Sequence, residues 1–390
     1  MQQWVQTWGQ AHTALSAFSF ASGCRTLRLV LKSNIGGAAI RVRLSNEFGR
    51  DAVILGGVCA ALCDEEGVLT SDSVDLDAPA FLPAGESAVT SEGALRVPAG
   101  SYLCVSVCVN GGPLQSGNLM NNARCLMMHG DRRHSIFPDD LGRFKDMLRG
   151  AASTLLRMKL PAPIPLFDTV ELLNADGASS IVVFGDSLSQ QGFWVNPFEE
   201  RIRDAFPGRF SVINRSIGGN RVLRDTSPVF PLKGFYGVRS LNRLRRDVLQ
   251  YPDISHAVLE VGVNDVLQFG TVSGRSNEKP DIDILTQGIF SMAAEMRANG
   301  IRVMGTTLPY IIDHIDGTKE KSDLVDQVNE TLRTNAEAFD ALLDLGAIVA
   351  DPDKPQHAKR EYLGGDKLHF NEKGGDAVAN AVDLGFFEQA

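Results

Sequence analysis

The stretch Ile181-Val-Val-Phe-Gly-Asp-Ser-Leu-Ser189 decides how the second half of this 390-residue chain folds. Its apolar residues end at Gly185, and the polar residues after them favour a turn that opens a helix. A short apolar run of this kind is typical of a parallel strand that is buried on both faces. We therefore expect the hydroxyl of Ser187 just beyond the carboxyl end of a strand, which is where ligands bind in open α/β sheets.

Similar apolar runs recur down the chain, separated by segments with helical periodicity. The runs predict strands at 181–184, 210–213, 257–261, 302–306 and 347–350. The other segments predict helices at 197–206, 241–249, 284–299, 323–343 and 375–384. Strands that alternate with helices form a parallel sheet covered on both faces. Residues 175–390 are therefore expected to form an α/β domain.

Residues 1–174 show a different pattern, of short strand-like runs between turns. The expected strands include 26–31, 40–44, 53–58, 88–90, 102–109 and 166–173. Ile40, Val42 and Leu44 alternate with polar side chains, as a half-buried strand requires. This half is therefore expected to be an all-β domain, a sandwich or jelly-roll-like fold, and we attach no catalytic role to it.

Charge and hydropathy narrow the range of partners. The formal net charge is -9, so the chain has no excess of Lys or Arg to neutralise phosphates, and neither nucleic acid nor a membrane is an expected partner. The densest basic cluster, Arg243, Arg245 and Arg246, predicts a solvated helix face.

No apolar run approaches the roughly 18 residues of a membrane-spanning helix. The N-terminus lacks the pattern of an export signal, so we expect a cytoplasmic protein.

Three further segments at predicted strand ends carry groups suited to catalysis. A turn with two adjacent glycines allows a close backbone approach, so the N–H of Gly219 is a candidate oxyanion donor. Asn264, after the third strand, offers a second donor from its side-chain amide. Asp366 and His369 lie three positions apart, so the carboxylate can accept a hydrogen bond from Nδ1 of the imidazole. Nε2 of His369 is then free to take the proton of Ser187. Each segment alone is typical of an ordinary turn or helix cap, but together they indicate acyl transfer.

With these segments the chain resembles the SGNH hydrolases, the GDSL-like lipase, acylhydrolase and esterase family named for Ser, Gly, Asn and His. The resemblance implies a flavodoxin-like three-layer α/β/α fold, with Ser187 as nucleophile, His369 as general base and Asp366 as the residue that orients the base. It also implies an oxyanion hole made of the Ser187 N–H, the Gly219 N–H and the Asn264 amide, and no metal or organic cofactor. The first domain resembles the β-rich N-terminal domain of one subgroup of these hydrolases.

The expected reaction is hydrolysis of carboxylic esters through an acyl-enzyme, on a small-molecule or carbohydrate substrate. Short acyl groups, such as acetyl on a carbohydrate or a small polar alcohol, are favoured because no long apolar lid is apparent.

The alternatives are a lysophospholipase- or thioesterase-type acyl hydrolase and a non-catalytic carbohydrate-binding protein on the same fold. A phosphate binder is less well supported, because the Gly-rich phosphate loop and its Lys are missing. The α/β-hydrolase motif is disfavoured because Ser189 stands where that motif needs Gly. The sequence assigns no substrate-binding residue and no oligomeric state.

Overall fold

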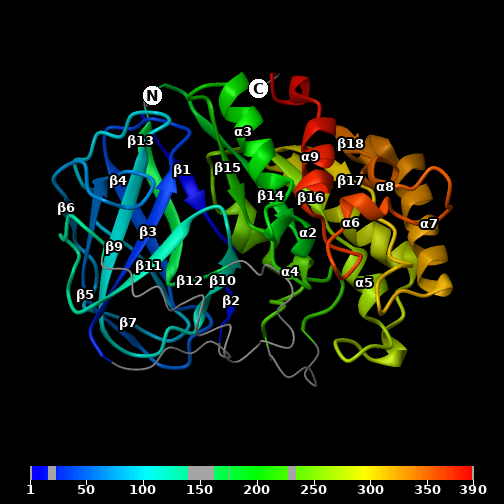
Figure 1. Ribbon diagram of the computed structural model, residues 1–390, viewed down its shortest axis with the longest axis horizontal. Helices are drawn as coiled ribbons and strands as arrows, with labels where there is room; N and C mark the ends of the chain where they lie inside the picture. The colour runs from blue at the N-terminus through cyan, green and yellow to red at the C-terminus, as the bar shows by residue number, and fades with distance from the viewer. Residues whose placement is uncertain (1, 16–22, 139–161, 175, 227–233, 389–390) are drawn as a thin grey trace. The chain divides into compact units, whose positions relative to one another are not determined.

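The computed structural model describes residues 2–15, 23–138, 162–174, 176–226 and 234–388. The chain gathers into two compact units, Met1–Ser180 with Arg203–Ile213 and Ile181–Ile202 with Asn214–Ala390. Figure 1 shows a first half built of strands and a second half in which strands and helices are mixed. Within the described residues, no helix is both long enough and apolar enough to cross a membrane.

The strands of the first half pair in antiparallel fashion. They are β1 (Gln3–Gly9), β2 (Thr13–Ala14), β3 (Arg25–Lys32), β4 (Ile40–Ser45), β5 (Val53–Leu62), β6 (Val74–Leu76), β7 (Phe81–Leu82), β8 (Ser87–Val89), β9 (Tyr102–Gly111), β10 (Ser116–Met120), β11 (Arg124–His129), β12 (Ala162–Pro165) and β13 (Phe167–Asn174). The sheet orders are β1-β13-β4-β8, β12-β10-β2 and β11-β3-β9-β5-β6, with β7 paired to β5. Strand β13 therefore returns to lie between β1 and β4.

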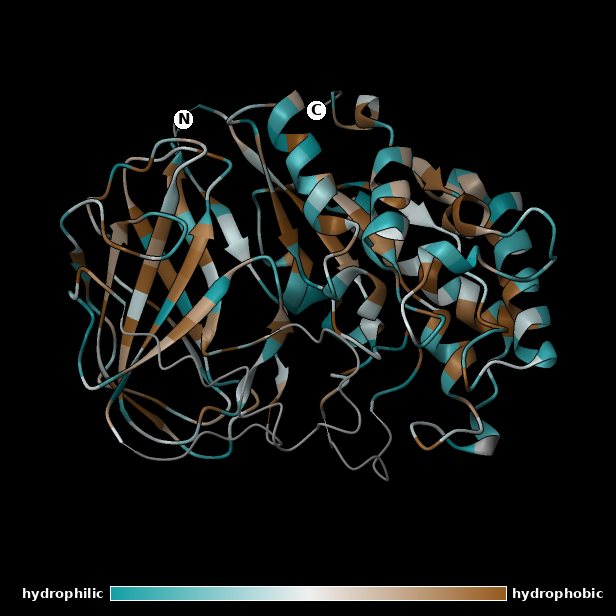
Figure 2. Cartoon of the chain, viewed as in Figure 1, coloured by the Kyte–Doolittle hydropathy of each residue, from teal (hydrophilic) through white to brown (hydrophobic). Residues whose placement is uncertain are grey.

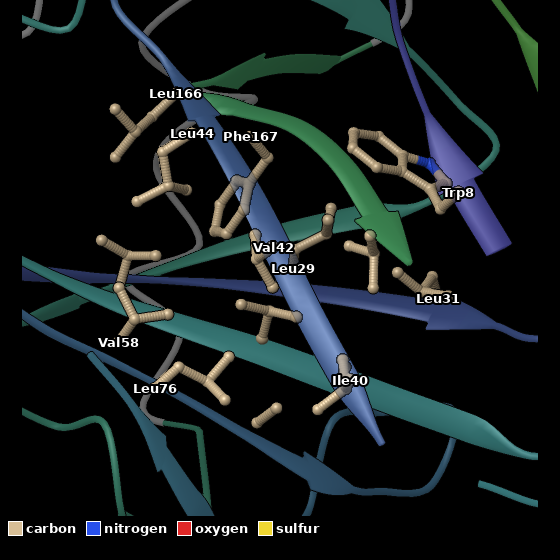
Figure 3. Close-up of a cluster of buried hydrophobic side chains, with 14 of the residues drawn as sticks. Trp8, Leu29, Leu31, Ile40, Val42, Leu44, Val58, Leu76, Leu166 and Phe167 are labelled. Atoms are coloured by element: carbon tan, nitrogen blue, oxygen red, sulfur yellow. The ribbon is translucent and has the colours of Figure 1, made fainter. Parts of the chain in front are cut away.

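A large hydrophobic core, with a smaller buried cluster of Val30, Ala61, Cys63, Cys104 and Leu126 beside it in the sheet, holds this β-rich half together. On β4, Ile40, Val42 and Leu44 are buried and the side chains between them are half-buried, so the predicted alternation is present. Leu29 on β3 and Phe167 on β13 are also fully buried. Figure 3 shows these side chains, drawn from different strands, turned toward one another. The β-rich fold predicted for the first half is confirmed.

A five-stranded sheet lies at the centre of the second half, as far as the described residues show. Its strands are β14 (Ser179–Gly185), β15 (Phe210–Asn214), β16 (Ile254–Glu260), β17 (Arg302–Thr306) and β18 (Ala341–Leu343). They lie in the order β15-β14-β16-β17-β18, and the pairs β16–β17 and β17–β18 are parallel. Counted in chain order this is 2-1-3-4-5, the order of flavodoxin-like sheets, whose ligands bind where the order reverses. That position lies at the ends of β14 and β16.

Helices connect these strands. They are α2 (Ser187–Gln190), α3 (Val195–Ala205), α4 (Ser240–Leu244), the π-helix η2 (Arg245–Leu249), α5 (Val263–Gln268), η3 (Ser276–Glu278), α6 (Ile282–Ala298), α7 (Lys319–Thr334), η4 (Ala336–Ala338), α8 (Leu345–Val349), η5 (Arg360–Tyr362), α9 (Glu372–Ala381) and η6 (Leu384–Phe387). Helix α6 contacts α4 and α7, and α7 also contacts α5. Helix α8 contacts α9, and Arg201 of α3 donates to the carbonyls of Ala379 in α9 and of Val382 just after it. Figure 2 shows hydrophobic strands beside helices of mixed character, as a sheet covered by amphipathic helices requires. The predicted α/β fold is confirmed.

The fifth strand does not lie where the sequence predicts it. Three of the four residues expected to form a strand at 347–350 belong to helix α8, which ends at Val349, and Ala350 forms only an isolated bridge to Ala358. The strand β18 lies inside the segment 323–343 that was expected to be helical. The side chain of Asp344 accepts a hydrogen bond from the Ala347 N–H and so caps the start of α8. A four-residue apolar run fits a strand or a buried helix equally well, so periodicity alone does not separate them.

Candidate active site

Ser187 occupies the first position of helix α2, directly after strand β14. The carboxylate of Asp186 accepts a hydrogen bond from the Leu188 N–H at 3.0 Å and so caps the helix. The serine hydroxyl lies 2.8 Å from Nε2 of His369, although the two residues are 182 positions apart in the chain. The tight strand-to-helix turn thus presents the hydroxyl to an imidazole, the arrangement that activates a serine nucleophile.

Asp366 and His369 are held together within one short loop. Nδ1 of His369 lies 2.5 Å from Oδ2 of Asp366, while Oδ1 of Asp366 accepts the backbone N–H groups of Leu368 and His369 at 3.1 and 3.2 Å. Lys367 between them has a φ of 62°, a left-handed conformation that tightens the loop. Burial by itself raises the pKa of Asp366, but the hydrogen bond and the charge of His369 lower that pKa to about 2. Asp366 is therefore a carboxylate at neutral pH.

Gly219 lies in the turn that follows strand β15. Its φ is 72°, and a Cβ atom at this position would lie 2.4 Å from a ring carbon of Tyr236, so only glycine fits here. Its neighbour Gly218 approaches the nucleophile, because a Cβ built on it would lie 3.6 Å from the Cβ of Ser187. Among the described residues, the backbone N–H groups of Ser187 and Gly219 have no hydrogen-bond acceptor. Both are thus available to a ligand oxygen.

Asn264 lies in the first turn of helix α5, after strand β16. Its Nδ2 donates to Oδ2 of Asp186 at 2.9 Å, which engages one of the two amide hydrogens. Gln268, one helical turn later, donates to Oδ1 of Asn264 at 3.2 Å and to the carbonyl of Gly219 at 2.7 Å. Gln268 was not predicted from the sequence, and it links the glycine turn to the asparagine.

Two buried carboxyl groups lie beneath the nucleophile. Asp186 and Glu260 are 0% and 1% exposed, and Oε2 of Glu260 accepts the Asp186 N–H at 3.3 Å and the Ser189 hydroxyl at 2.8 Å. Burial raises the pKa of Asp186 to about 7; burial and the neighbouring Asp186 charge raise the pKa of Glu260 well above its usual range. The sequence analysis missed Glu260, although a charged residue inside the apolar run 257–261 was a signal.

The structure brings together Ser187, His369 and Asp366, as the sequence analysis expected. His314, to which the sequence reasoning gave no role, lies close enough to interact electrostatically with Asp366 and His369, and burial lowers its pKa. Within the described ranges, no three His, Cys, Asp or Glu side chains are grouped as a metal site requires.

One prediction about the basic cluster is wrong. Arg245 is exposed and Arg246 half-buried, but Arg243 is only 1% exposed, so the helix does not present all three to solvent. Arg243 shares a helix face with Leu244 and Asp247, and that spacing was the available signal.

The sequence model of the GDSL-like lipase/acylhydrolase family matches residues 183–377, which is half of the chain. Comparison with curated proteins gives no match. Among solved structures, a GDSL-like lipase from Bacteroides thetaiotaomicron VPI-5482 is 17% identical over 56% of this chain and 92% of its own, with a TM-score of 0.40. A catalytic mutant of an acetylxylan esterase from Geobacillus stearothermophilus is 17% identical over 53% and 93%, with a TM-score of 0.42. Another acetyl xylan esterase is 22% identical over 52% and 96%, with a TM-score of 0.40.

The family match and the site fall on the same part of the chain. The matched range begins within strand β14 and ends within helix α9, and it includes Ser187, Gly219, Asn264, Asp366 and His369. The chain belongs to the GDSL-like lipase/acylhydrolase family and is a carboxylic ester hydrolase.

Proposed function

We propose that this protein hydrolyses esters through an acyl-enzyme on Ser187, and that its substrates carry short acyl groups, such as acetyl, on a carbohydrate or a small polar alcohol. The observation that carries the proposal is the chain of two hydrogen bonds from Ser187 Oγ through His369 to Asp366, at 2.8 and 2.5 Å. All of these residues lie in 175–390, which we propose is the hydrolase domain, with 1–174 as a separate β domain.

In the proposed acylation step, Oγ of Ser187 attacks the ester carbonyl carbon while Nε2 of His369 takes the hydroxyl proton. Asp366 keeps the remaining ring proton on Nδ1 and stabilises the imidazolium that forms. The carbonyl oxygen becomes an oxyanion, which the N–H groups of Ser187 and Gly219 and the second amide hydrogen of Asn264 stabilise. The intermediate then collapses, and the alcohol leaves with the proton from His369.

Deacylation repeats these steps with water as the nucleophile. His369 takes a proton from water as the water oxygen attacks the acyl carbonyl carbon. The same donors stabilise the second oxyanion. Collapse of this intermediate breaks the bond to Ser187, whose Oγ recovers its proton from His369, and releases the carboxylic acid. Every group that the two half-reactions need comes from the chain and from the substrate.

A polar alcohol is favoured by an ionisable side chain within electrostatic reach of the proposed triad. The loop after strand β17 carries His314 and Asp316, and the charges of Asp366, His369 and Asp316 all act on His314. An ionisable side chain at such a position suits a hydroxylated leaving group better than a long alkyl chain, which gains free energy from apolar contact.

Release of p-nitrophenol from p-nitrophenyl acetate tests the proposal. The wild type should turn over, and a folded Ser187→Ala variant should lose activity by several orders of magnitude. Equal activity of the two proteins would remove Ser187 from the mechanism. If both were inactive, the carbohydrate-binding alternative would gain support. A series of acetyl, butyryl and octanoyl esters tests the acyl preference, and faster turnover of octanoyl would favour the lysophospholipase- or thioesterase-type alternative.

A further inference from the structure

We propose that Arg243 is a positioning residue for the oxyanion hole, because its guanidinium ties the end of strand β14 to the turn that carries Gly219. The inference rests on the proposed function. The N–H groups of Ser187 and Gly219 come from two separate loops, so they converge on one oxygen atom only if the loops keep a fixed separation. A misplacement of about 1 Å at a reacting centre can lower a rate by roughly 100-fold. A group that bonds to both loops therefore acts on catalysis without touching the substrate.

The guanidinium of Arg243 bonds to both loops at once. Nη2 donates to the carbonyl of Gly185 at 2.9 Å, and Gly185 lies two positions before the nucleophile. Nη1 donates to the carbonyl of Arg215 at 2.7 Å, at the start of the glycine turn. Nε donates to Oδ1 of Asn220 at 2.8 Å, and Asn220 directly follows the oxyanion glycine. The side chain of Arg243 is 0% exposed, so water does not compete for these bonds.

Asn220 passes this restraint on to the glycine turn. Its Oδ1 also accepts the hydroxyl of Ser240, at 2.7 Å, and its Nδ2 donates to the carbonyls of Tyr236 and Val238, each at 2.8 Å. Both ends of the amide are therefore occupied, and its orientation is fixed. The residue after Gly219 is thus anchored to the start of helix α4, the helix that carries Arg243.

The charge of Arg243 is balanced inside the protein. Asp247, four residues later, lies 3.0 Å from Nη1 of Arg243 and receives two further bonds from Arg246 at 2.6 and 3.0 Å. Burial alone raises the pKa of Asp247, but the charges of Arg246 and Arg243 keep that pKa below its usual range. The guanidinium carbon also lies 3.8 Å from the centre of the Phe184 ring, so one face of the group stacks on strand β14.

Lysine does not reproduce this arrangement. A guanidinium is a planar fork whose donors reach acceptors on different sides, whereas an ammonium presents its donors from a single atom. A contribution to stability does not by itself explain a buried ion pair here, because well-packed apolar residues in its place often make a folded protein equally or more stable. The geometry instead suits a group that sets the distance between two loops.

Arg243→Lys tests the inference, with Arg28→Lys as the matched control. Arg28 is also fully buried, in the β-rich half, and its guanidinium donates to Ser106, Gly67 and Ser135. Both substitutions remove a buried fork, so both should lower the melting temperature. We expect Arg243→Lys to lower kcat for p-nitrophenyl acetate by about tenfold or more while KM changes by less than about threefold, because oxyanion donors act on the transition state. Arg28→Lys should leave kcat unchanged.

Hydrogen exchange gives a second readout that does not depend on activity. Peptides that cover 183–190 and 214–222 should exchange faster in Arg243→Lys than in wild type or in Arg28→Lys. Unchanged kcat, unchanged exchange in those peptides, or an equal loss of kcat in both variants would overturn the inference. If Ser187→Ala keeps its activity, the proposed function fails and the oxyanion role of Arg243 fails with it. If Ser187→Ala is inactive but Arg243→Lys is not impaired, the inference alone fails.

Discussion

Replacement of Asp366 by Asn probes the proposed triad with a change of one atom. Oδ1 of Asp366 accepts two backbone N–H groups, from Leu368 and His369, while Oδ2 faces Nδ1 of His369. In the variant, the amide oxygen must take the Oδ1 position to keep the two backbone bonds. The amide NH₂ then faces Nδ1, which becomes an acceptor, so the imidazole proton moves to Nε2. In that tautomer His369 donates to Ser187 and no longer accepts its proton.

Two contributions set the size of the effect. Flipping the amide would restore the productive tautomer but would lose two backbone hydrogen bonds, worth about 1 kcal/mol each. The flipped state is therefore disfavoured by about 2 kcal/mol, or roughly 30-fold. The variant also lacks the carboxylate charge that stabilises the imidazolium. The corresponding change in Ser-His-Asp hydrolases lowers kcat by about 10⁴, so we expect a fall in kcat of about 10³ to 10⁴ with the fold intact.

Steady-state hydrolysis of p-nitrophenyl acetate measures this effect, beside Asp313→Asn as a matched control. Asp313 accepts from His357 at 2.8 Å, a second carboxylate–imidazole pair to which we assign no role in the reaction. The control should keep kcat within about threefold, because Asp313 and His357 are each about a third exposed and, within the described residues, neither bonds to Ser187, Asp366 or His369. A folded Asp366→Asn variant that keeps more than about a tenth of the wild-type kcat would refute the reasoning.

Two other substitutions test the rest of the site. Asn264→Ala should lower kcat by about 10² to 10³, because it removes one oxyanion donor, and an unchanged kcat would exclude Asn264 from the mechanism. Glu260→Gln tests the buried carboxyl pair. Burial raises the pKa of Glu260, so the folded protein binds the Glu260 proton more tightly than the unfolded chain does. This group therefore lowers the free energy of unfolding as pH rises above about 4, the pKa of an unperturbed Glu. The decrease is at most about 1.4 kcal/mol per pH unit. Unfolding free energies between pH 5 and pH 8 should therefore fall less in Glu260→Gln, and equal slopes would contradict the reasoning.

The sequence predicted most of the fold because the periodicity was clear where the elements were long. The strand at 302–306 and the helix at 284–299 lie within two residues of their predicted bounds. Prediction failed at residues 341–349, where two short apolar runs adjoin. Ala and Leu in the first run favour a helix by propensity, yet pairing with β17 makes it a strand. Pairing with β17, which no local pattern shows, decided the first outcome, and the Asp344 cap decided the second. An Asp directly before an apolar run is a helix-start signal that the prediction did not use.

The candidate site was predictable where each residue lies at a strand end or in a short motif. Ser187 and the pair Asp366 and His369 were identified in that way, and their side chains meet. Contacts between distant segments were not predictable. Nothing in the sequence shows that Asn264 bonds to Asp186 or that Arg243 bonds to Gly185, because both contacts depend on how separate loops pack.

The loop that holds Asp366 and His369 has a consequence for how the site assembles. The acid and the base are close in sequence, and the bond from the Gly364 N–H to the His369 carbonyl at 2.7 Å closes their loop. The loop alone therefore fixes the position of His369 relative to Asp366, whereas the hydrogen bond from His369 to Ser187 joins two distant segments of the chain. A displacement of the loop would carry both residues away together and disengage the nucleophile without separating the base from its carboxylate. Such a movement would switch activity on or off as a unit and would not produce a partly competent enzyme.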